Sequence, residues 1–169
     1  MLVIWRWQRA HGETLADLGW RKPTTKTAIV LAVLLGLFYL WGTVMGAKVL
    51  LPGVNVYALD PLRLLLVPLG IFMAIAEETM MRGFFITQLQ RAGVPTWLQI
   101  IASGACSASY HTIQNPSLLG FLPAFVLFSI HAGLYVLGKR SLTPVALAHG
   151  IYHVFGEPYL LMMSLASMG

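Results

Sequence analysis

The chain has 169 residues, of which 57% are hydrophobic and only 10% are charged. A soluble domain is about 45–50% apolar and about 25% charged, so the composition excludes an ordinary soluble protein and indicates an integral membrane protein. The formal net charge of +5 does not indicate nucleic-acid binding, because the basic residues flank apolar stretches. The single cysteine, Cys106, excludes an intrachain disulfide.

The first 25 residues are predicted to form an interfacial segment. Tryptophan and leucine are mixed there with arginine and lysine, which is typical of a partly amphipathic stretch lying on a membrane surface. The apolar start, residues 1–5, is too short for a cleavable signal peptide, and charges follow it at once. We therefore expect residues 1–25 to contact the lipid bilayer without crossing it.

Residues 26–169 are predicted to form one all-α domain, a polytopic transmembrane helix bundle. About five stretches are candidate spans, at residues 27–47, 62–90, 97–112, 118–138 and 143–156. The second stretch is longer than the hydrocarbon core, so we expect it to tilt, to kink near Pro68 or to project from the membrane. A last apolar piece, residues 159–168, completes a crossing or folds back.

The distribution of positive charge predicts the orientation of the chain. Lysine and arginine concentrate on the cytoplasmic side of membrane proteins. With a cytoplasmic N-terminus, eight of the eleven lysines and arginines lie inside and two lie outside. The inner eight are Arg6, Arg9, Arg21, Lys22, Lys26, Arg91, Lys139 and Arg140.

Two adjacent glutamates and an arginine, Glu77, Glu78 and Arg82, interrupt the second apolar stretch. A charge at the bilayer centre costs roughly 2.5–3.5 kcal/mol on insertion scales, so this cluster is predicted to be a functional site facing the protein interior. Glu78 and Arg82 have the i, i+4 spacing of a helical ion pair. Glu77 points about 100° away, so it is predicted to face a partner other than this cation and to serve as a general base. The alternative is a purely structural salt bridge.

Three histidines in later stretches are candidate partners of the glutamates. His111 follows a run of small residues, 102–109, that lets helices approach closely. His149 and His153 are spaced i, i+4 and share one helix face. Counted along the helices, all three lie at a depth similar to that of the glutamates, which predicts a water-containing cavity in the membrane. His131 has no partner at helical spacing and is interpreted as structural or peripheral.

These residue types favour hydrolysis. The sequence contains neither His-Glu-x-x-His nor Gly-x-Ser-x-Gly. A glutamate and a histidine can activate a water for attack on a carbonyl, and further donors can stabilise the oxyanion. No cofactor is favoured, but histidine and carboxylate ligands also suit zinc. In that alternative the metal ligands are Glu77, His111, His149 and His153.

Three motifs together resemble those of a known family. They are Glu-Glu-x-x-x-Arg-Gly at residues 77–83, a histidine that closes the next span, and His-x-x-x-polar in a later span. In this order they are similar to the CAAX protease and bacteriocin-processing (CPBP, or Abi) family of membrane endopeptidases. Residues 13–23 and 141–144 also look like segments that these proteins carry. The resemblance covers about residues 60–157 and implies a protease core similar to the type II CAAX prenyl endopeptidases.

The resemblance also implies a role for each motif residue. Glu77 is the general base for water and His111 assists it. Glu78 and Arg82 orient the site, and His149 helps to form the oxyanion hole. A metal-free glutamate mechanism is favoured over the zinc mechanism because of the expected pairing between Glu78 and Arg82.

The chain departs from the family pattern at two positions. Ser107 stands where an aromatic residue usually precedes the motif histidine by four positions, which widens the expected cavity. His153 stands where the last motif usually ends in asparagine, although a neutral histidine can still donate one hydrogen bond. These departures also fit a catalytically altered binding or immunity protein of the same family. A proton or cation carrier is a weaker alternative, because the sequence shows no internal repeat.

The expected function is that of an intramembrane endopeptidase. We expect it to hydrolyse a peptide bond in a membrane-associated protein or peptide, such as a leader or a C-terminal sorting or anchor tail. The expected partners are this substrate and the lipid bilayer, with no nucleic acid. The expected location is a prokaryotic cytoplasmic membrane, with the N-terminus in the cytoplasm.

Overall fold

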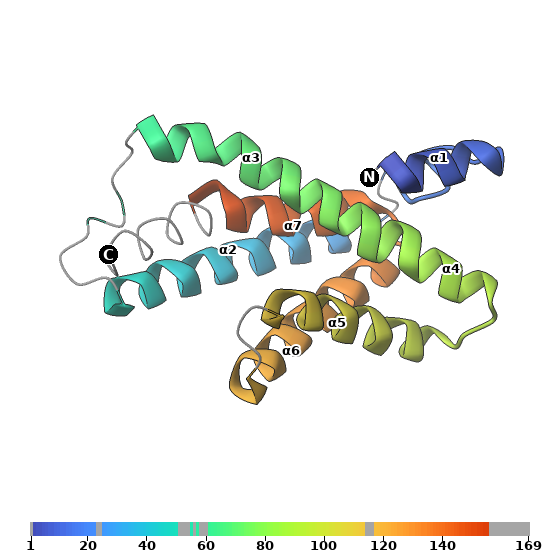
Figure 1. Cartoon of the computed structure of the whole chain (residues 1–169). Helices are drawn as coiled ribbons and strands as arrows, with labels where there is room; N and C mark the ends of the chain where they lie inside the picture. The colour runs from blue at the N-terminus through green and yellow to red at the C-terminus, as the bar shows by residue number, and fades with distance from the viewer. Residues whose placement is uncertain are drawn as a thin grey trace. The chain divides into compact units, whose positions relative to one another are not determined.

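All regular secondary structure in the described part of the chain is helical. The computed structural model describes residues 2–22, 25–50, 55, 57, 61–113 and 117–155. Its elements are shown in Figure 1: α1 (Leu2–Ala10), α2 (Lys26–Leu50), α3 (Pro61–Glu78), the π-helix η1 (Thr79–Phe85), α4 (Ile86–Arg91), α5 (Thr96–Thr112), α6 (Leu118–Leu137) and α7 (Leu142–Phe155). The all-α prediction is confirmed.

Three helical stretches are long and apolar enough to cross a membrane, at Lys26–Val49, Arg63–Arg91 and Leu118–Leu137. They match the first, second and fourth predicted spans. The third and fifth predicted spans are helical as well, but α5 has 17 residues and α7 has 14, whereas a spanning helix needs about 20. Five crossings therefore stay a prediction. The predicted last apolar piece, residues 159–168, lies outside the described residues.

Two compact units make up the chain. The first contains residues 1–29 and 76–145, and the second contains residues 30–75 and 146–169. The boundary therefore falls inside α2, inside α3 and inside α7. The N-terminal segment belongs to the first unit, together with the two glutamates, Arg82 and His111. All eight cations predicted to lie on the cytoplasmic side also belong to the first unit.

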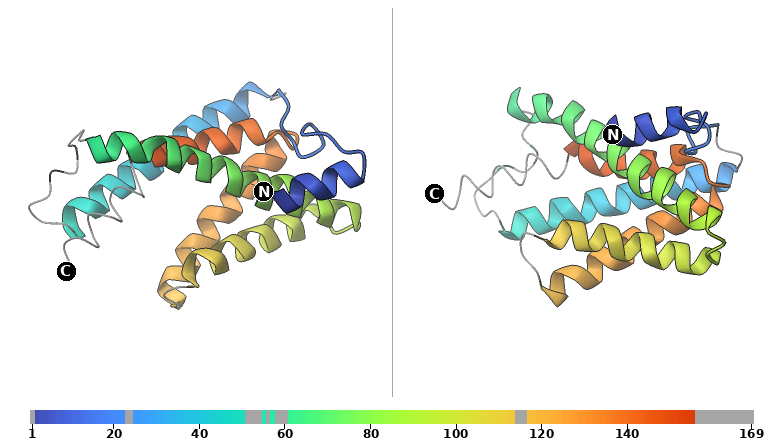
Figure 2. Two further views of the ribbon diagram at one scale, coloured as in Figure 1. Left: turned by 45° about the horizontal axis from the view of Figure 1, so that its top comes forward. Right: turned by 45° about the vertical axis from the view of Figure 1, so that its right-hand side comes forward.

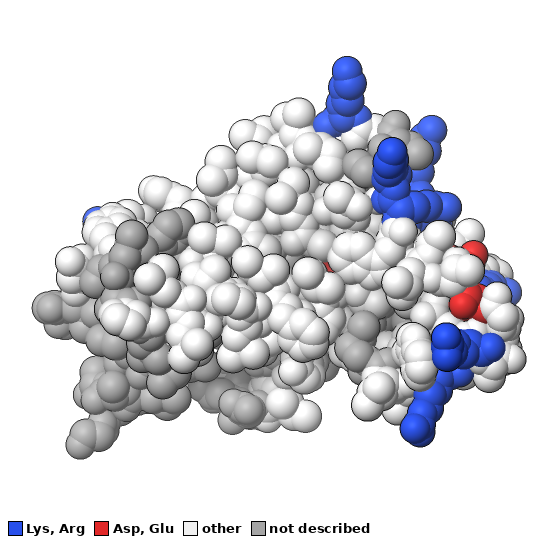
Figure 3. Space-filling model, turned by 90° about the horizontal axis from the view of Figure 1, so that it is seen from above, with Lys and Arg blue, Asp and Glu red and all other residues white. Residues whose placement is uncertain are grey.

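Much of the surface is uncharged, as expected for a chain in contact with lipid. Figure 3 shows lysine and arginine side chains gathered in a few places on a face that otherwise carries almost no charge. Large apolar side chains on the candidate spans are exposed, among them Leu34, Phe38, Phe72 and Val126. In a membrane these side chains contact acyl chains in place of water.

The closest helix packing in the first unit joins α5 and α6. These helices run side by side in both views of Figure 2. Small residues allow this close approach, because a Cβ placed on Gly104 would overlap the Ser129 side chain and lie 3.1 Å from the Ser129 backbone nitrogen. This contact fixes the position of α5, which carries His111.

Gly104→Ala should therefore separate α5 from α6 and lower the free energy of unfolding by about 1–3 kcal/mol, the usual range for overpacking. Gly133→Ala on α6 is the matched control, because a Cβ there meets no described atom within 4 Å. The measurement is unfolding in mixed detergent micelles by titration with a denaturing detergent. Equal unfolding free energies for the two variants would contradict the close-approach interpretation.

Candidate active site

The charged motif lies at a change of helix type. Glu77 and Glu78 end α3, and Arg82 lies in the seven-residue π-helix η1 that follows. The Ile86 backbone N–H donates to the Met81 carbonyl oxygen, which is the i→i−5 bond of a π-helix. The sequence predicts one continuous helix over this stretch, and the π segment is a difference from that prediction. Such segments are rare and frequently occur at functional sites.

Arg82 contacts both glutamates. Its Nε lies 3.3 Å from Oε2 of Glu78, and its Nη1 lies 4.0 Å from Oε1 of Glu77. The predicted i, i+4 pair with Glu78 is confirmed. The guanidinium group also approaches Glu77, so Glu77 is not fully separate from this cation.

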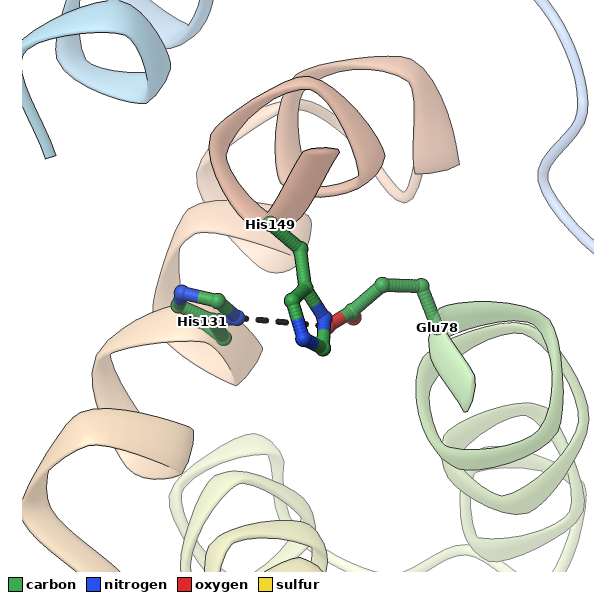
Figure 4. A group of neighbouring side chains, drawn as sticks. All are labelled: Glu78, His131 and His149. Atoms are coloured by element: carbon green, nitrogen blue, oxygen red, sulfur yellow. Dashed lines mark hydrogen bonds and ion pairs between the residues drawn. The ribbon is translucent and has the colours of Figure 1, made fainter. Parts of the chain in front are cut away.

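The Glu78–Arg82 pair is fully buried, and both of its members have further partners. Arg82 Nη2 donates to the Phe128 carbonyl oxygen at 3.0 Å, and the guanidinium carbon lies 5.4 Å from the centroid of the Phe128 ring. Glu78 Oε1 lies 3.2 Å from Nδ1 of His131, as Figure 4 shows. Both charges are therefore desolvated but paired, which is the condition under which buried ions persist.

His131 is the site residue that the sequence analysis missed. It is buried on α6 and separated from Glu78 by 53 positions, so helical spacing within one segment gave no sign of the contact. One signal was present, since a histidine in the middle of an apolar span indicates function by the same rule that marked the glutamates. His131 is therefore not peripheral, and its buried contact with Glu78 agrees with the structural half of the interpretation.

Glu77 contacts a different histidine. His111 Nε2 lies 3.1 and 3.2 Å from the two carboxylate oxygens of Glu77. The His111 ring stacks on Phe128 with centroids 4.6 Å apart. The expectation that the small residues of α5 bring His111 to the glutamates is confirmed. The adjacent glutamates therefore have separate partners on separate helices, as their different directions on the helix predicted.

The two glutamate–histidine pairs differ in accessibility. The side chains of Glu77 and His111 are 13% and 27% exposed, whereas that of His131 is 4% exposed and that of Glu78 is fully buried. The first pair is therefore partly exposed at the surface of the structure, and the second pair is buried. The geometry therefore divides the cluster into an accessible pair and a buried support.

The remaining predicted site residues lie on α5 and α7. Ser107 is fully buried one turn before His111, and its hydroxyl has no hydrogen-bond partner among the described residues. His149 and His153 lie on one face of α7 with stacked rings, 4.8 Å between centroids, which confirms their predicted spacing. Both belong to the second unit, so their meeting with the glutamates stays a prediction.

Comparison with known proteins gives one match. A family model described as "Type II CAAX prenyl endopeptidase Rce1-like" matches residues 59–155. Searches among curated proteins and among solved structures gave no match. The matched segment is more than half of the chain and contains both glutamates, Arg82 and all the histidines discussed above. It begins after the N-terminal segment, which the family model does not cover. The chain belongs to the Rce1-like family of type II CAAX prenyl endopeptidases.

Proposed function

We propose that the protein is an intramembrane endopeptidase in which Glu77 and His111 activate a water molecule to hydrolyse a peptide bond. The observation that carries this proposal is the accessible Glu77–His111 pair, 3.1 Å apart, held against a fully buried Glu78–Arg82 pair. A carboxylate supported by an imidazole is a suitable general base. The family membership supports the reaction class.

The reaction follows from the accessible pair. Glu77 accepts a proton from water while the water oxygen bonds to the carbonyl carbon of the scissile peptide, which gives a tetrahedral oxyanion. The proton is then delivered to the amide nitrogen as the carbon–nitrogen bond breaks, and this releases a carboxylic acid and an amine. His111 holds the Glu77 carboxylate in place. It is also positioned to carry the proton from Glu77 to the amide nitrogen.

Two further groups of residues support these steps. Glu78, Arg82 and His131 hold the π-helix and so fix the direction of Glu77, at no cost of reorganisation during the reaction. His149 is proposed to donate a hydrogen bond to the oxyanion, with His153 beside it on the same face of α7. This role for His149 rests on the family motif.

The proposed substrate is a membrane-associated peptide segment, either a leader or a C-terminal sorting or anchor tail. A site on membrane-length helices favours a segment that itself lies in or on the bilayer. The proposed setting is a prokaryotic cytoplasmic membrane with the N-terminus in the cytoplasm. The cation distribution supports this orientation, because eight of the eleven lysines and arginines then lie on the cytoplasmic side.

Metal dependence is tested on the purified protein. In detergent, with a library of membrane peptides, we expect cleavage that persists in the presence of a strong chelator. Mass spectrometry of the products identifies the scissile bond. Loss of cleavage on chelation, with restoration by zinc and one zinc bound per chain, would replace this mechanism by the zinc alternative, with Glu77 or the histidines as ligands.

A binding or immunity protein of the same family is the second candidate. Two observations favour it: buried Ser107 replaces the usual aromatic residue, and His153 replaces the usual asparagine. Such a protein would retain its cellular effect in a Glu77→Gln variant that accumulates normally. An endopeptidase would lose that effect.

A further inference from the structure

Residues 18–20, outside the segment matched by the family model, pack directly on the π-helix that carries Arg82. Trp20 Nε1 donates to the Thr79 hydroxyl at 3.1 Å, and Thr79 is the first residue of η1. A Cβ placed on Gly83, one residue after Arg82, would lie 2.7 Å from the Leu18 carbonyl oxygen. Leu18 and Thr79 are both buried. The N-terminal segment therefore contacts η1 on both sides of Arg82 in sequence.

The same residues are fixed to the turn between α6 and α7. The Leu142 backbone N–H donates to the Gly19 carbonyl oxygen at 2.8 Å. Arg21 Nη2 donates to the Lys139 carbonyl oxygen at 2.7 Å, and Ser141 Oγ donates to the Arg21 carbonyl oxygen at 2.7 Å.

Glycine is required at position 19, where the N-terminal segment contacts the turn between α6 and α7. Its φ of +97° lies in the left-handed region, and a Cβ there would lie 2.6 Å from the Arg140 carbonyl oxygen. Residues 18–21 thus bridge η1 and the turn.

Contacts earlier in the segment hold it in this place. The Trp7 ring lies edge-on to Phe84 of η1, with centroids 5.3 Å apart, and Glu13 forms a 2.6 Å ion pair with Arg91 of α4. Asp17 accepts hydrogen bonds from the Thr14 backbone N–H and hydroxyl, which hold the pKa of its carboxyl below the ordinary value of 3.8. The segment is therefore packed as part of the first unit.

We infer that Leu18, Gly19 and Trp20 act as a clamp that positions Arg82, and through it the two glutamates. A π-helix is rare and needs tertiary contacts to persist in place of the ordinary α-helix. If η1 relaxed to α-helical geometry, Arg82 would turn relative to Glu77 and Glu78, and the base would lose its alignment. The clamp residues are positioning residues, and this inference rests on the proposed function for its kinetic consequence.

The test removes the hydrogen bond between Trp20 and Thr79 and keeps the packing of both side chains. Trp20→Phe keeps an aromatic ring without the N–H donor, and Thr79→Val keeps the side-chain shape without the hydroxyl. The control for Trp20→Phe is Trp5→Phe, because the Trp5 ring is exposed on α1. The control for Thr79→Val is Thr43→Val on α2, in the second unit. Each variant is assayed for peptide cleavage, for thermal stability, and for the ¹⁵N resonances of the His111 and His131 rings.

We expect kcat of either clamp variant to fall on the order of 10–100-fold, the effect of a small misplacement of a catalytic group, with little change in KM. The kcat of the double variant should be no lower than that of either single variant, because both substitutions remove the same hydrogen bond. The His111 ring resonance should shift in both clamp variants and in neither control. Thermal stability should stay close to that of the controls.

The readouts separate the clamp from the proposed activity. Wild-type kcat together with an unshifted His111 resonance in Trp20→Phe would overturn the clamp. A fall in kcat that merely parallels thermal stability would overturn it too, because it would show general destabilisation. If the wild-type protein cleaves no peptide but the resonance shifts as expected, the clamp stands and the proposed function falls.

Discussion

Replacing Glu77 by glutamine should reduce kcat for peptide cleavage by about 10²–10⁴-fold, the range over which general bases contribute. Glutamine has nearly the same shape, and its carbonyl oxygen can still accept a hydrogen bond from His111. It cannot accept a proton from water. The protein should therefore fold and accumulate, and only the chemical step should be lost.

The control for this result is Gln90→Glu, the reverse substitution at an exposed position of α4 in the first unit. That variant should retain most of the activity. His111→Asn should resemble Glu77→Gln, and the double variant should be no worse than either single variant, because residues that act as a unit are not additive. Undiminished cleavage in Glu77→Gln would rule out the glutamate as base.

Arg82→Met should lower the free energy of unfolding by about 3–5 kcal/mol, because it leaves the Glu78 carboxylate buried without its cation. Arg82 and Glu78 are fully buried and 3.3 Å apart, so solvent cannot replace the lost partner. The substitution also removes the hydrogen bond to the Phe128 carbonyl oxygen. We expect poor accumulation in the membrane and a large drop in apparent melting temperature in detergent.

A second substitution distinguishes charge burial from lost packing. Adding Glu78→Gln to Arg82→Met removes the uncompensated charge, so a substantial part of the stability should return. Arg6→Met, at an exposed position of α1, should have little effect. If the double variant is less stable than Arg82→Met, the instability comes from packing and not from the stranded carboxylate.

Short-range patterns in the sequence gave the correct contacts where both partners lie on one helix. The Glu78–Arg82 pair and the shared face of His149 and His153 follow from helical spacing alone. The close approach of α5 was also predictable, because small residues in an apolar helix have few other reasons to gather. Depth along the helices predicted that histidines lie level with the glutamates, whereas the specific pairing of Glu77 with His111 was implied by the family resemblance.

Contacts between distant segments were not predictable in the same way. His131 meets Glu78 across 53 positions, and no spacing rule relates residues on two different helices. The π-helix was not predictable, because helical spacing does not distinguish a short π segment from the α-helix around it and such segments are rare. The N-terminal segment was assigned to the membrane surface from its amphipathic composition, which cannot reveal packing on η1.

The clamp has a consequence for how the protein is made. Trp20 and Thr79 are 59 positions apart, and Arg21 and Lys139 are 118 positions apart. Trp20 and Arg21 leave the ribosome several seconds before Lys139, because chains emerge at about 5–20 residues per second. The site therefore cannot be complete until the turn before α7 has been synthesised. Under the proposed function, a nascent chain halted before this turn would hold both glutamates and His111 without these contacts, and we expect it to cleave no peptide.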